Sequence, residues 1–457
     1  MKITSALRYF ILTLILAAQL NLQSQTVYQP DWKSLDSRPA PQWFTDAKFG
    51  IFLHWGLYSV PAWATNSNAD GFGSNYAEWY WERLNNKNLK IHKEFVDFHQ
   101  KNYGPNFSYQ DFVGGFKAEL FNPDQWAKIF KDAGAKYVVL TSKHHDGFAL
   151  WPSREAWNWN AMDVGPRRDL AGDLSKAVKA SGLHMGFYYS LYEWYNPLYQ
   201  QDVHKYVDEH MLPQMKDLVN RYQPDIFWPD GEWSQSDTTW KSKEFISWLF
   251  NESPVKDRVV VNDRWGTKDR IHGTFTTTEY GHGNASLNKP WEECRGIGES
   301  FGYNRNENLE QYLSSGALIN LLVDVVSRGG NLLLNIGPAA DGTIPVIMQQ
   351  RLKDMGDWLN INGEAIYGTT AWKEAPVKKD LPVYYTRKGN DLYVISTKWQ
   401  PAIAVPGIKK GKVTMLGYKG TIRQQQKGNT ISITAPALTP AENPSSYAWV
   451  YKIAGAF

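Results

Sequence analysis

Two carboxylates in this chain stand where strand-like segments end. Residues 226–228 form a short apolar run, and Asp230 follows after a single proline. Glu279 comes directly after residues 275–278, a Phe-Thr-Thr-Thr run of a composition typical of strands. A carboxylate beside a buried strand is costly unless it lies at the mouth of a site. Two carboxylates from different strands are also the pair that glycoside hydrolysis uses, one as nucleophile or base and one as acid.

Other polar side chains lie at the ends of strand-like segments in the same way. They are His54, His144, His145, Tyr188 and Arg264. Such groups hydrogen-bond several hydroxyls at once, and an arginine beside Asp230 would keep that carboxylate ionised. The histidines also fit a metal-dependent hydrolase, but adjacent histidines on a strand point to opposite faces unless the strand ends between them. We therefore predict a sugar site with no metal and no cofactor.

Eight strand-like segments alternate with helical patterns. The predicted strands are residues 48–55, 137–142, 186–191, 226–228, 258–261, 275–278, 299–303 and 331–336. The helical patterns that separate most of them are residues 124–132, 170–181, 204–222, 245–250, 309–326 and 346–359. This α/β alternation predicts a (β/α)8 barrel with its site at the carboxyl ends of the strands. We expect a distorted barrel, because no clear helix follows the fifth and sixth strands. A doubly wound sheet ranks second, because no glycine-rich phosphate loop follows the first strand.

The two ends of the chain differ from the barrel region, residues 25–372. Residues 1–24 combine a basic start with an apolar run too short to span a membrane comfortably. This predicts a cleaved signal peptide, export to the periplasm or the extracellular medium, and no stable membrane insertion. An uncleaved anchor is the alternative. Residues 373–457 contain short alternating segments with Gly, Asn and Pro turns, which predict a small C-terminal β-sandwich.

Composition limits the classes of partner. Charged residues make up 21% of the chain and hydrophobic residues 42%, as in a globular protein. The net charge is +3, and removal of Lys2 and Arg8 with the signal leaves about +1 (3 − 2), which argues against a nucleic-acid partner. The 21 tryptophans suit the flat faces of sugars, and composition favours this use only slightly over an aromatic-rich core. The single cysteine, Cys294, excludes an intrachain disulfide.

Longer motifs in the chain resemble those of the α-L-fucosidases of glycoside hydrolase family 29. They are residues 43–56 (WFTDAKFGIFLHWG), 143–151 (KHHDGFALW), 186–194 (GFYYSLYEW), 217–233 (DLVNRYQPDIFWPDGEW), 262–266 (NDRWG), 299–303 (ESFGY) and 329–338 (GGNLLLNIGP). They extend across most of residues 40–370, and their combination is specific. The resemblance implies an exo-acting, retaining, metal-free hydrolase that removes terminal α-L-fucose from fucosylated glycans.

The resemblance also implies a role for individual residues. Asp230 matches the nucleophile. Glu279 is the first choice for the acid/base, and Glu292 is the alternative, because some members of the family take this carboxylate from the loop that matches the Glu292 segment. The positions that match the fucose pocket are His54, Glu78, Trp79, His144, His145, Tyr188, Trp228, Arg264 and Phe301. Phe301 would belong to an apolar wall for the methyl group of the sugar.

Two further functions stay open at the level of sequence. One is an inactive relative that binds fucose without turnover, although the presence of Asp230 argues against it. The other is a barrel glycosidase for another sugar, such as L-galactose, which differs from fucose at the methyl position.

Overall fold

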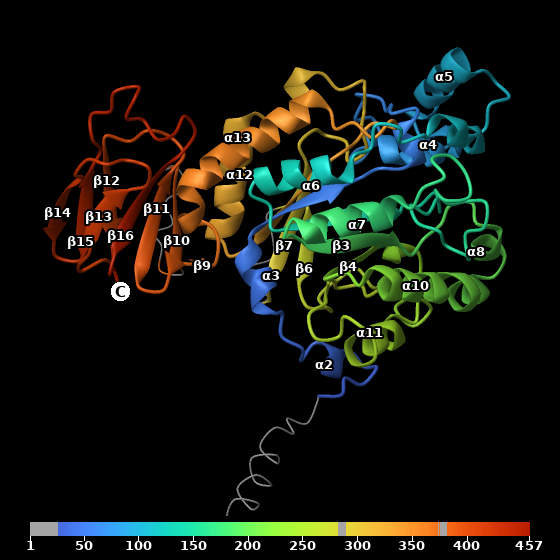
Figure 1. The fold of residues 1–457 in the computed structure, drawn as a ribbon, viewed down its shortest axis with the longest axis horizontal. Helices are drawn as coiled ribbons and strands as arrows, with labels where there is room; N and C mark the ends of the chain where they lie inside the picture. Colours follow the sequence, from blue (N-terminus) through green and yellow to red (C-terminus); the bar gives the residue numbers. More distant parts are fainter. Residues whose placement is uncertain (1–25, 282–288, 373, 375–381) are drawn as a thin grey trace, which may run out of the picture.

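A curled sheet of eight parallel strands forms the centre of the protein (Figure 1). The computed structural model describes residues 26–281, 289–372, 374 and 382–457. The strands are β1 Phe49–Leu53, β2 Tyr137–Lys143, β3 His184–Ser190, β4 Ile226–Asp230, β5 Val260–Val261, β6 Thr276–Glu279, β7 Trp291–Gly296 and β8 Asn331–Ile336. Their order in the sheet is β5-β4-β3-β2-β1-β8-β7-β6. The predicted distorted (β/α)8 architecture is confirmed.

The distortion lies between the two edge strands, β5 and β6. In the described chain no ladder joins them, and no helix lies between Val261 and Thr276. Instead, the amide of Thr274 donates to the carbonyl of Val261 (2.9 Å), and the amide of Val261 donates to Oγ1 of Thr274 (2.7 Å). Strand β5 has only two residues, so the chain turns early into the polar segment that carries Arg264.

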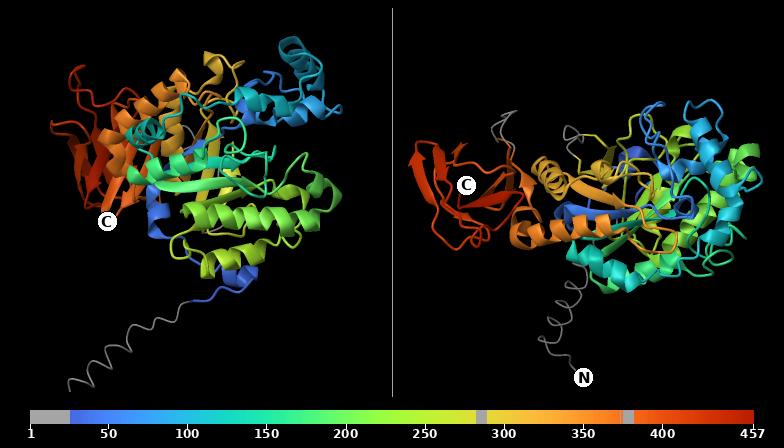
Figure 2. Two further views of the ribbon diagram at one scale, coloured as in Figure 1. Left: turned by 45° about the vertical axis from the view of Figure 1, so that its right-hand side comes forward. Right: turned by 90° about the horizontal axis from the view of Figure 1, so that it is seen from above.

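Helices cover the outside of the sheet (Figure 2). They are α6 Pro123–Asp132, α7 Leu170–Ala180, α10 Leu212–Tyr222, α11 Ser242–Asn251, α12 Ser315–Ser327 and α13 Val346–Asn362. The other α-helices are α5 His92–Tyr103 and the short α2 Trp32–Leu35, α3 Gln42–Ala47, α4 Tyr80–Asn85, α8 Pro197–Gln201 and α9 Val203–Tyr206. Helix α6 illustrates how the sequence starts a helix. Asn122 accepts a hydrogen bond from the amide of Gln125 (3.0 Å), and proline occupies the first turn.

The interior of the barrel is filled with aromatic and aliphatic side chains. Phe52, Tyr188 and Trp228 belong to this cluster, and the rings of Phe52 and Trp228 lie 5.1 Å apart. Helix α3 closes the amino-terminal end, where the ring of Phe44 packs on Phe275 at 4.5 Å. The floor of any site at the other end is therefore aromatic and rigid.

The seventh strand differs from the prediction. We expected residues 299–303, but these form bends, and β7 spans Trp291–Gly296. The sequence did not predict this strand, because the adjacent charged residues Glu292 and Glu293 do not fit the apolar pattern of a buried strand. Both are buried, and both accept hydrogen bonds from side chains of other strands, so their burial is compensated. Glu292 therefore lies in a barrel strand, whereas we had expected it in a loop.

The C-terminal region forms two antiparallel sheets with their own core, as the sequence predicts. One sheet has the order β13-β16-β11-β10-β9 and the other β12-β15-β14. The strands are β9 Thr370–Ala371, β10 Val383–Lys388, β11 Asp391–Ser396, β12 Ala402–Pro406, β13 Lys412–Met415, β14 Arg423–Lys427, β15 Thr430–Thr434 and β16 Trp449–Ala454. This sandwich packs beside α12 and α13 (Figure 1). At the junction, Nε1 of Trp358 donates to the carbonyl of Ala448 at 3.0 Å.

The predicted signal peptide, residues 1–24, lies outside the described residues. Of the helices that are described, none has the length and apolar character to cross a membrane.

Candidate active site

A cavity of about 310 Å³ opens at the carboxyl ends of the barrel strands. Asp230, Glu279 and all nine residues predicted to bind the sugar line it, whereas Glu292 does not. The structure thus brings eleven predicted residues from distant parts of the chain to one place. Their individual roles stay predictions.

Asp230 ends β4, where two groups donate hydrogen bonds to it and a third lies close by. Arg264 Nη1 lies 2.8 Å from its Oδ1, the Tyr188 hydroxyl donates to Oδ2 at 2.9 Å, and His145 Nε2 lies 3.8 Å from Oδ2. Burial would raise the pKa of Asp230, but the Arg264 charge and the hydrogen bonds from Arg264 and Tyr188 hold it below its usual value. The carboxylate is therefore ionised near neutral pH, as a nucleophile must be.

Glu279 shares the same guanidinium. Arg264 Nη2 lies 3.3 Å from its Oε2, and the Tyr76 hydroxyl donates to Oε1 at 3.2 Å. Its side chain is 25% exposed and that of Asp230 is 12% exposed, so Glu279 lies nearer the solvent. One arginine thus holds two carboxylates from β4 and β6 at a single mouth.

Glu292 lies one layer deeper, inside the barrel. It accepts hydrogen bonds from the Tyr137 hydroxyl (2.6 Å) and from Trp228 Nε1 (2.9 Å). Burial raises its pKa to about 7, and the two donors only partly oppose this shift. Glu292 supports the Trp228 ring from below, and the residue that faces the cavity from the same strand is Cys294.

The two adjacent histidines both reach the cavity, because β2 ends at Lys143, before them. Their rings lie 4.2 Å apart. The alternation of side chains between the two faces of a strand therefore does not separate His144 from His145. In the described residues, no group of three or more His, Cys, Asp or Glu is arranged to hold a metal ion.

Hydrogen bonds behind two histidines fix their tautomers. The Ser190 hydroxyl gives its only proton to the carbonyl of Tyr192 (2.6 Å), so Ser190 Oγ must accept from His145 Nδ1–H (2.5 Å). Asn335 Nδ2 donates to the carbonyl of Phe301, so its Oδ1 accepts from His54 Nδ1–H at 2.7 Å. Each imidazole then keeps Nε2 as a lone-pair acceptor.

Burial keeps both rings neutral. It lowers the pKa of His54 to about 3 and that of His145 to about 4, although the Asp230 charge opposes both shifts. Two neutral imidazoles with acceptor nitrogens suit a ligand that presents hydroxyl protons, as a sugar does.

Glu78 anchors a wall of the cavity. Its Oε2 accepts from the amide of Gly302 at 2.7 Å, next to Phe301. The Phe301 ring lies 4.9 Å from that of His54 and 6.5 Å from that of Phe52. The segment that we had predicted as a strand thus contributes an apolar wall instead. Burial raises the pKa of Glu78 to about 7.

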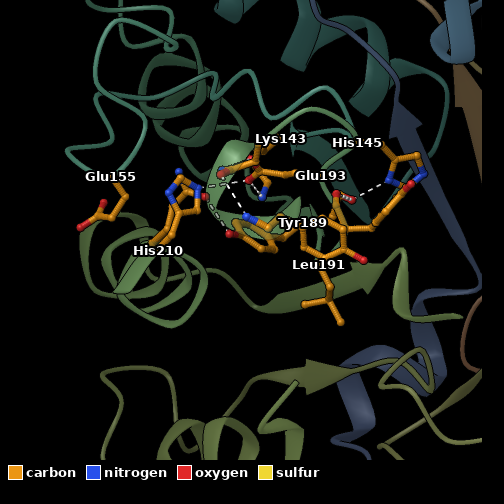
Figure 3. Close-up of polar contacts among 12 residues, drawn as sticks. Lys143, His145, Glu155, Tyr189, Leu191, Glu193 and His210 are labelled. Atoms are coloured by element: carbon orange, nitrogen blue, oxygen red, sulfur yellow. Dashed lines mark hydrogen bonds and ion pairs between the residues drawn. The ribbon is translucent and has the colours of Figure 1, made fainter. Parts of the chain in front are cut away.

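A buried ion pair lies behind the histidines (Figure 3). Lys143 Nζ contacts Glu193 Oε1, and His210 Nε2 reaches the same oxygen at 3.1 Å. Lys143 immediately precedes His144, and Glu193 immediately precedes Trp194, whose amide donates to the carbonyl of His145 (2.9 Å). The pair therefore joins the loops after β2 and β3 directly behind the cavity.

Sequence reasoning missed several residues that line the cavity. They are Phe52, Phe72, Gly73, Tyr76, Arg83, Trp233, Arg270 and Cys294. Phe52 could have been found, because it lies in a predicted barrel strand at an inward position near its carboxyl end. Cys294 could not, because its strand β7 was not predicted. Phe72, Tyr76 and Arg270 come from irregular segments with no periodic pattern, and Arg83 lies in the short helix α4.

The barrel and its paired carboxylates define the class of protein: this is the arrangement of a glycoside hydrolase. Comparison with known proteins identifies the family. The α-L-fucosidase family profile matches residues 15–364, and that of the α-L-fucosidase C-terminal domain matches residues 378–454. The chain belongs to the α-L-fucosidase family.

Relatives support this assignment over almost the whole chain. The tissue α-L-fucosidase of Homo sapiens is 44% identical over 446 residues, which are 94% of this chain and 92% of that protein. The crystal structure of Thermotoga maritima α-fucosidase superposes with a TM-score of 0.79 at 39% identity, covering 93% of this chain and 100% of that one. A structure of the Thermotoga maritima enzyme in complex with fucose has the same TM-score and coverage at 38% identity.

Proposed function

We propose that this protein hydrolyses terminal α-L-fucose from fucosylated glycans with retention of configuration. The observation that carries the proposal is the position of Arg264, which contacts both Asp230 and Glu279 at the mouth of the barrel. Retaining glycosidases place their two carboxyl groups about 5–5.5 Å apart, closer than inverting enzymes do. Contact of both carboxylates with one guanidinium supports a closely spaced pair and hence a retaining reaction.

The reaction has two steps. Asp230 attacks the anomeric carbon from the β face, and the bond to the leaving oxygen breaks as Glu279 gives that oxygen its proton. Water then attacks the same carbon from the α face, Glu279 takes a proton from the water, and the ester bond to Asp230 breaks. Arg264 keeps Asp230 ionised for the first step. In the second step it stabilises the Asp230 carboxylate as the leaving group.

The apolar wall supports fucose over sugars that carry a hydroxyl at the methyl position. Phe301 and Phe52 offer no hydrogen-bond partner there, so a hydroxyl that lost its water would go unpaired. We therefore expect L-galactosides to be poorer substrates than L-fucosides, by about 10- to 100-fold in kcat/KM.

The test is hydrolysis of an aryl α-L-fucoside, with the first-formed sugar followed by proton NMR. We expect α-L-fucose to appear before mutarotation. Initial release of β-L-fucose would overturn retention. Saturable fucose binding without turnover of any fucoside would establish the binding relative instead, and faster hydrolysis of the matched α-L-galactoside would establish the other-sugar glycosidase.

We also propose that the protein is exported, on the basis of the basic and apolar start of the chain. The mass of the protein recovered from the periplasm or medium should correspond to a chain that begins at Gln25. Recovery of the full-length chain with the membrane fraction would favour the uncleaved anchor.

A further inference from the structure

The outer part of the cavity carries two aromatic rings that the predicted fucose contacts do not use. Phe72 is 68% exposed and Trp233 is 50% exposed. The exposed Phe and Trp side chains of the described chain are Phe72, Trp157, Trp233 and Trp399, and two of these four line this one cavity. Exposed apolar surface gathered at the rim of a site marks a place where a ligand binds.

Phe72 lies on the side of Glu279. Its ring packs edge-on against Tyr76 (5.6 Å) and Tyr280 (5.8 Å). Tyr76 donates to Glu279, and Tyr280 follows Glu279 in the chain. An acid that protonates the glycosidic oxygen lies where the departing part of the substrate is attached. That part of the substrate must therefore leave past Phe72.

Trp233 extends the aromatic wall from the inner cavity to the rim. It follows the Asp230 strand end by three residues, and its ring is nearly parallel to that of Trp79 (20°, centroids 6.3 Å apart). It also meets His145 edge-on at 5.4 Å. The two exposed rings thus belong to the two loops that carry the proposed nucleophile and the contacts of the proposed acid.

The turn that presents Phe72 is built and anchored. Gly71 and Gly73 flank the ring with φ of +85° and +80°, a backbone region that favours glycine. Arg83 Nη2 donates to the carbonyl of Gly73 (3.1 Å), and its guanidinium lies over the Trp79 ring at 4.8 Å. The exposed ring is therefore held in place beside the cavity.

We propose that Phe72 and Trp233 form a subsite for the sugar ring to which the fucose is attached, and that this ring is a neutral pyranose. Aromatic faces stack on the C–H faces of pyranoses. The ring is neutral because both cations at the rim are already paired: Arg83 with Glu82 (2.6 Å) and Arg270 with Glu232 (2.5 Å). The inference rests on the proposed function and on Glu279 as its acid.

The experiment compares substrates with and without an aglycone ring. α-L-Fucosyl fluoride has the same fucose but no second ring, whereas an α-L-fucosyl disaccharide has a neutral pyranose there. Phe72→Ala and Trp233→Ala should each lower kcat/KM for the disaccharide about tenfold and change that for the fluoride less than about twofold. Phe72→Tyr and Trp233→Phe, which keep a ring, should restore most of the loss. Trp157→Ala is the matched control, because Trp157 is 78% exposed but does not line the cavity.

Three results would overturn the proposal. They are an unchanged kcat/KM for the disaccharide in both alanine variants, an equal loss on both substrates, or the same loss in Trp157→Ala. A disaccharide with a uronic acid as the second ring tests the charge, and a higher kcat/KM for it than for the neutral one would overturn the neutral assignment. A parent protein that fails on α-L-fucosyl fluoride would instead refute the proposed function itself.

Discussion

At the scale of single residues, the site depends on groups that never touch the sugar. Ser190 accepts a hydrogen bond from Nδ1–H of His145, and Asn335 accepts one from Nδ1–H of His54. Both Nε2 atoms are therefore left as acceptors. Asn335 lies in a motif that resembles the family, and Ser190 lies in another, yet neither had a role that the sequence could assign. A tautomer depends on the direction of a hydrogen bond, which only the three-dimensional arrangement gives.

Ser190→Ala should lower kcat/KM about tenfold or more. The change leaves the buried Nδ1–H of His145 without its acceptor, a loss of about 1–3 kcal/mol, and frees the ring to turn. Steady-state kinetics on an aryl α-L-fucoside measures the effect. The control is Ser59→Ala, because the Ser59 hydroxyl is buried without a hydrogen-bond partner in the described structure, and its activity should stay that of the parent. Equal effects in the two variants would contradict the tautomer argument.

Glu292→Gln should keep activity and should stabilise the protein at alkaline pH. The folded-state pKa of Glu292 is raised from 4.5 to about 7, so the folded protein holds a proton that the unfolded chain loses first. Ionising this buried group therefore removes stability as pH rises from about 4.5 to 7, by up to about 3 kcal/mol. The gain from Glu292→Gln should be absent at pH 4 and full at pH 8.

Denaturant unfolding at the two pH values measures this difference. A gain that is larger at pH 4 would contradict the sign of the shift. Loss of activity in Glu292→Gln, with restoration by azide, would return Glu292 as the acid/base.

At the scale of elements, strand ends were predictable and one strand was not. Segments such as Ile226–Asp230 combine an apolar run with a polar end, and both features follow from a buried strand that stops at a site. Strand β7 breaks this rule, because Glu292 and Glu293 are buried in its middle. Their partners, Tyr137 and Thr278, are distant in sequence, so no local pattern could reveal that the burial is compensated.

The Lys143–Glu193 pair links two elements and should show strong coupling. Lys143 is fully buried, so Glu193→Gln leaves a buried charge with a lost partner and should cost about 3–5 kcal/mol of unfolding free energy. Lys143→Met with Glu193→Gln removes both charges and should cost less than Glu193→Gln alone. Urea unfolding of the two variants and of Lys143→Met completes the cycle. Single costs that add up in the double variant would contradict a buried ion pair.

At the scale of the whole molecule, the barrel and the sandwich share packed surface. Ile395 and Val450 of the sandwich belong to the same apolar cluster as Trp358 of α13. The tyrosine hydroxyl of Tyr393 donates to Glu364 at 2.7 Å across the same junction. The sequence predicted the two units but not this junction, because a helix face covered by a later domain has the same pattern as one covered by the barrel itself.

Trp372→Ala should test whether the two units unfold together. Trp372 is buried in the core of the sandwich, far from the carboxylate pair, and its loss should cost about 3–5 kcal/mol there. If the junction couples the units, calorimetry shows a single unfolding transition. Its midpoint temperature and the temperature at which activity is lost then both fall by several degrees. A low-temperature transition that leaves thermal loss of activity unchanged would show that the sandwich unfolds independently.

The central claim is that Asp230 is the nucleophile and Glu279 the acid/base of a retaining reaction. The most direct measurement is azide rescue of Asp230→Ala and Glu279→Ala on an aryl α-L-fucoside, with the product anomer read by NMR. Without azide, we expect the kcat/KM of each variant to be lower than that of the parent by about 10²–10⁴-fold. With azide, Asp230→Ala should give β-L-fucosyl azide, because azide takes the place of the carboxylate. Glu279→Ala should give the α anomer, because azide replaces the water of the second step. Unchanged turnover in either variant, or the opposite anomers, would contradict the assignment.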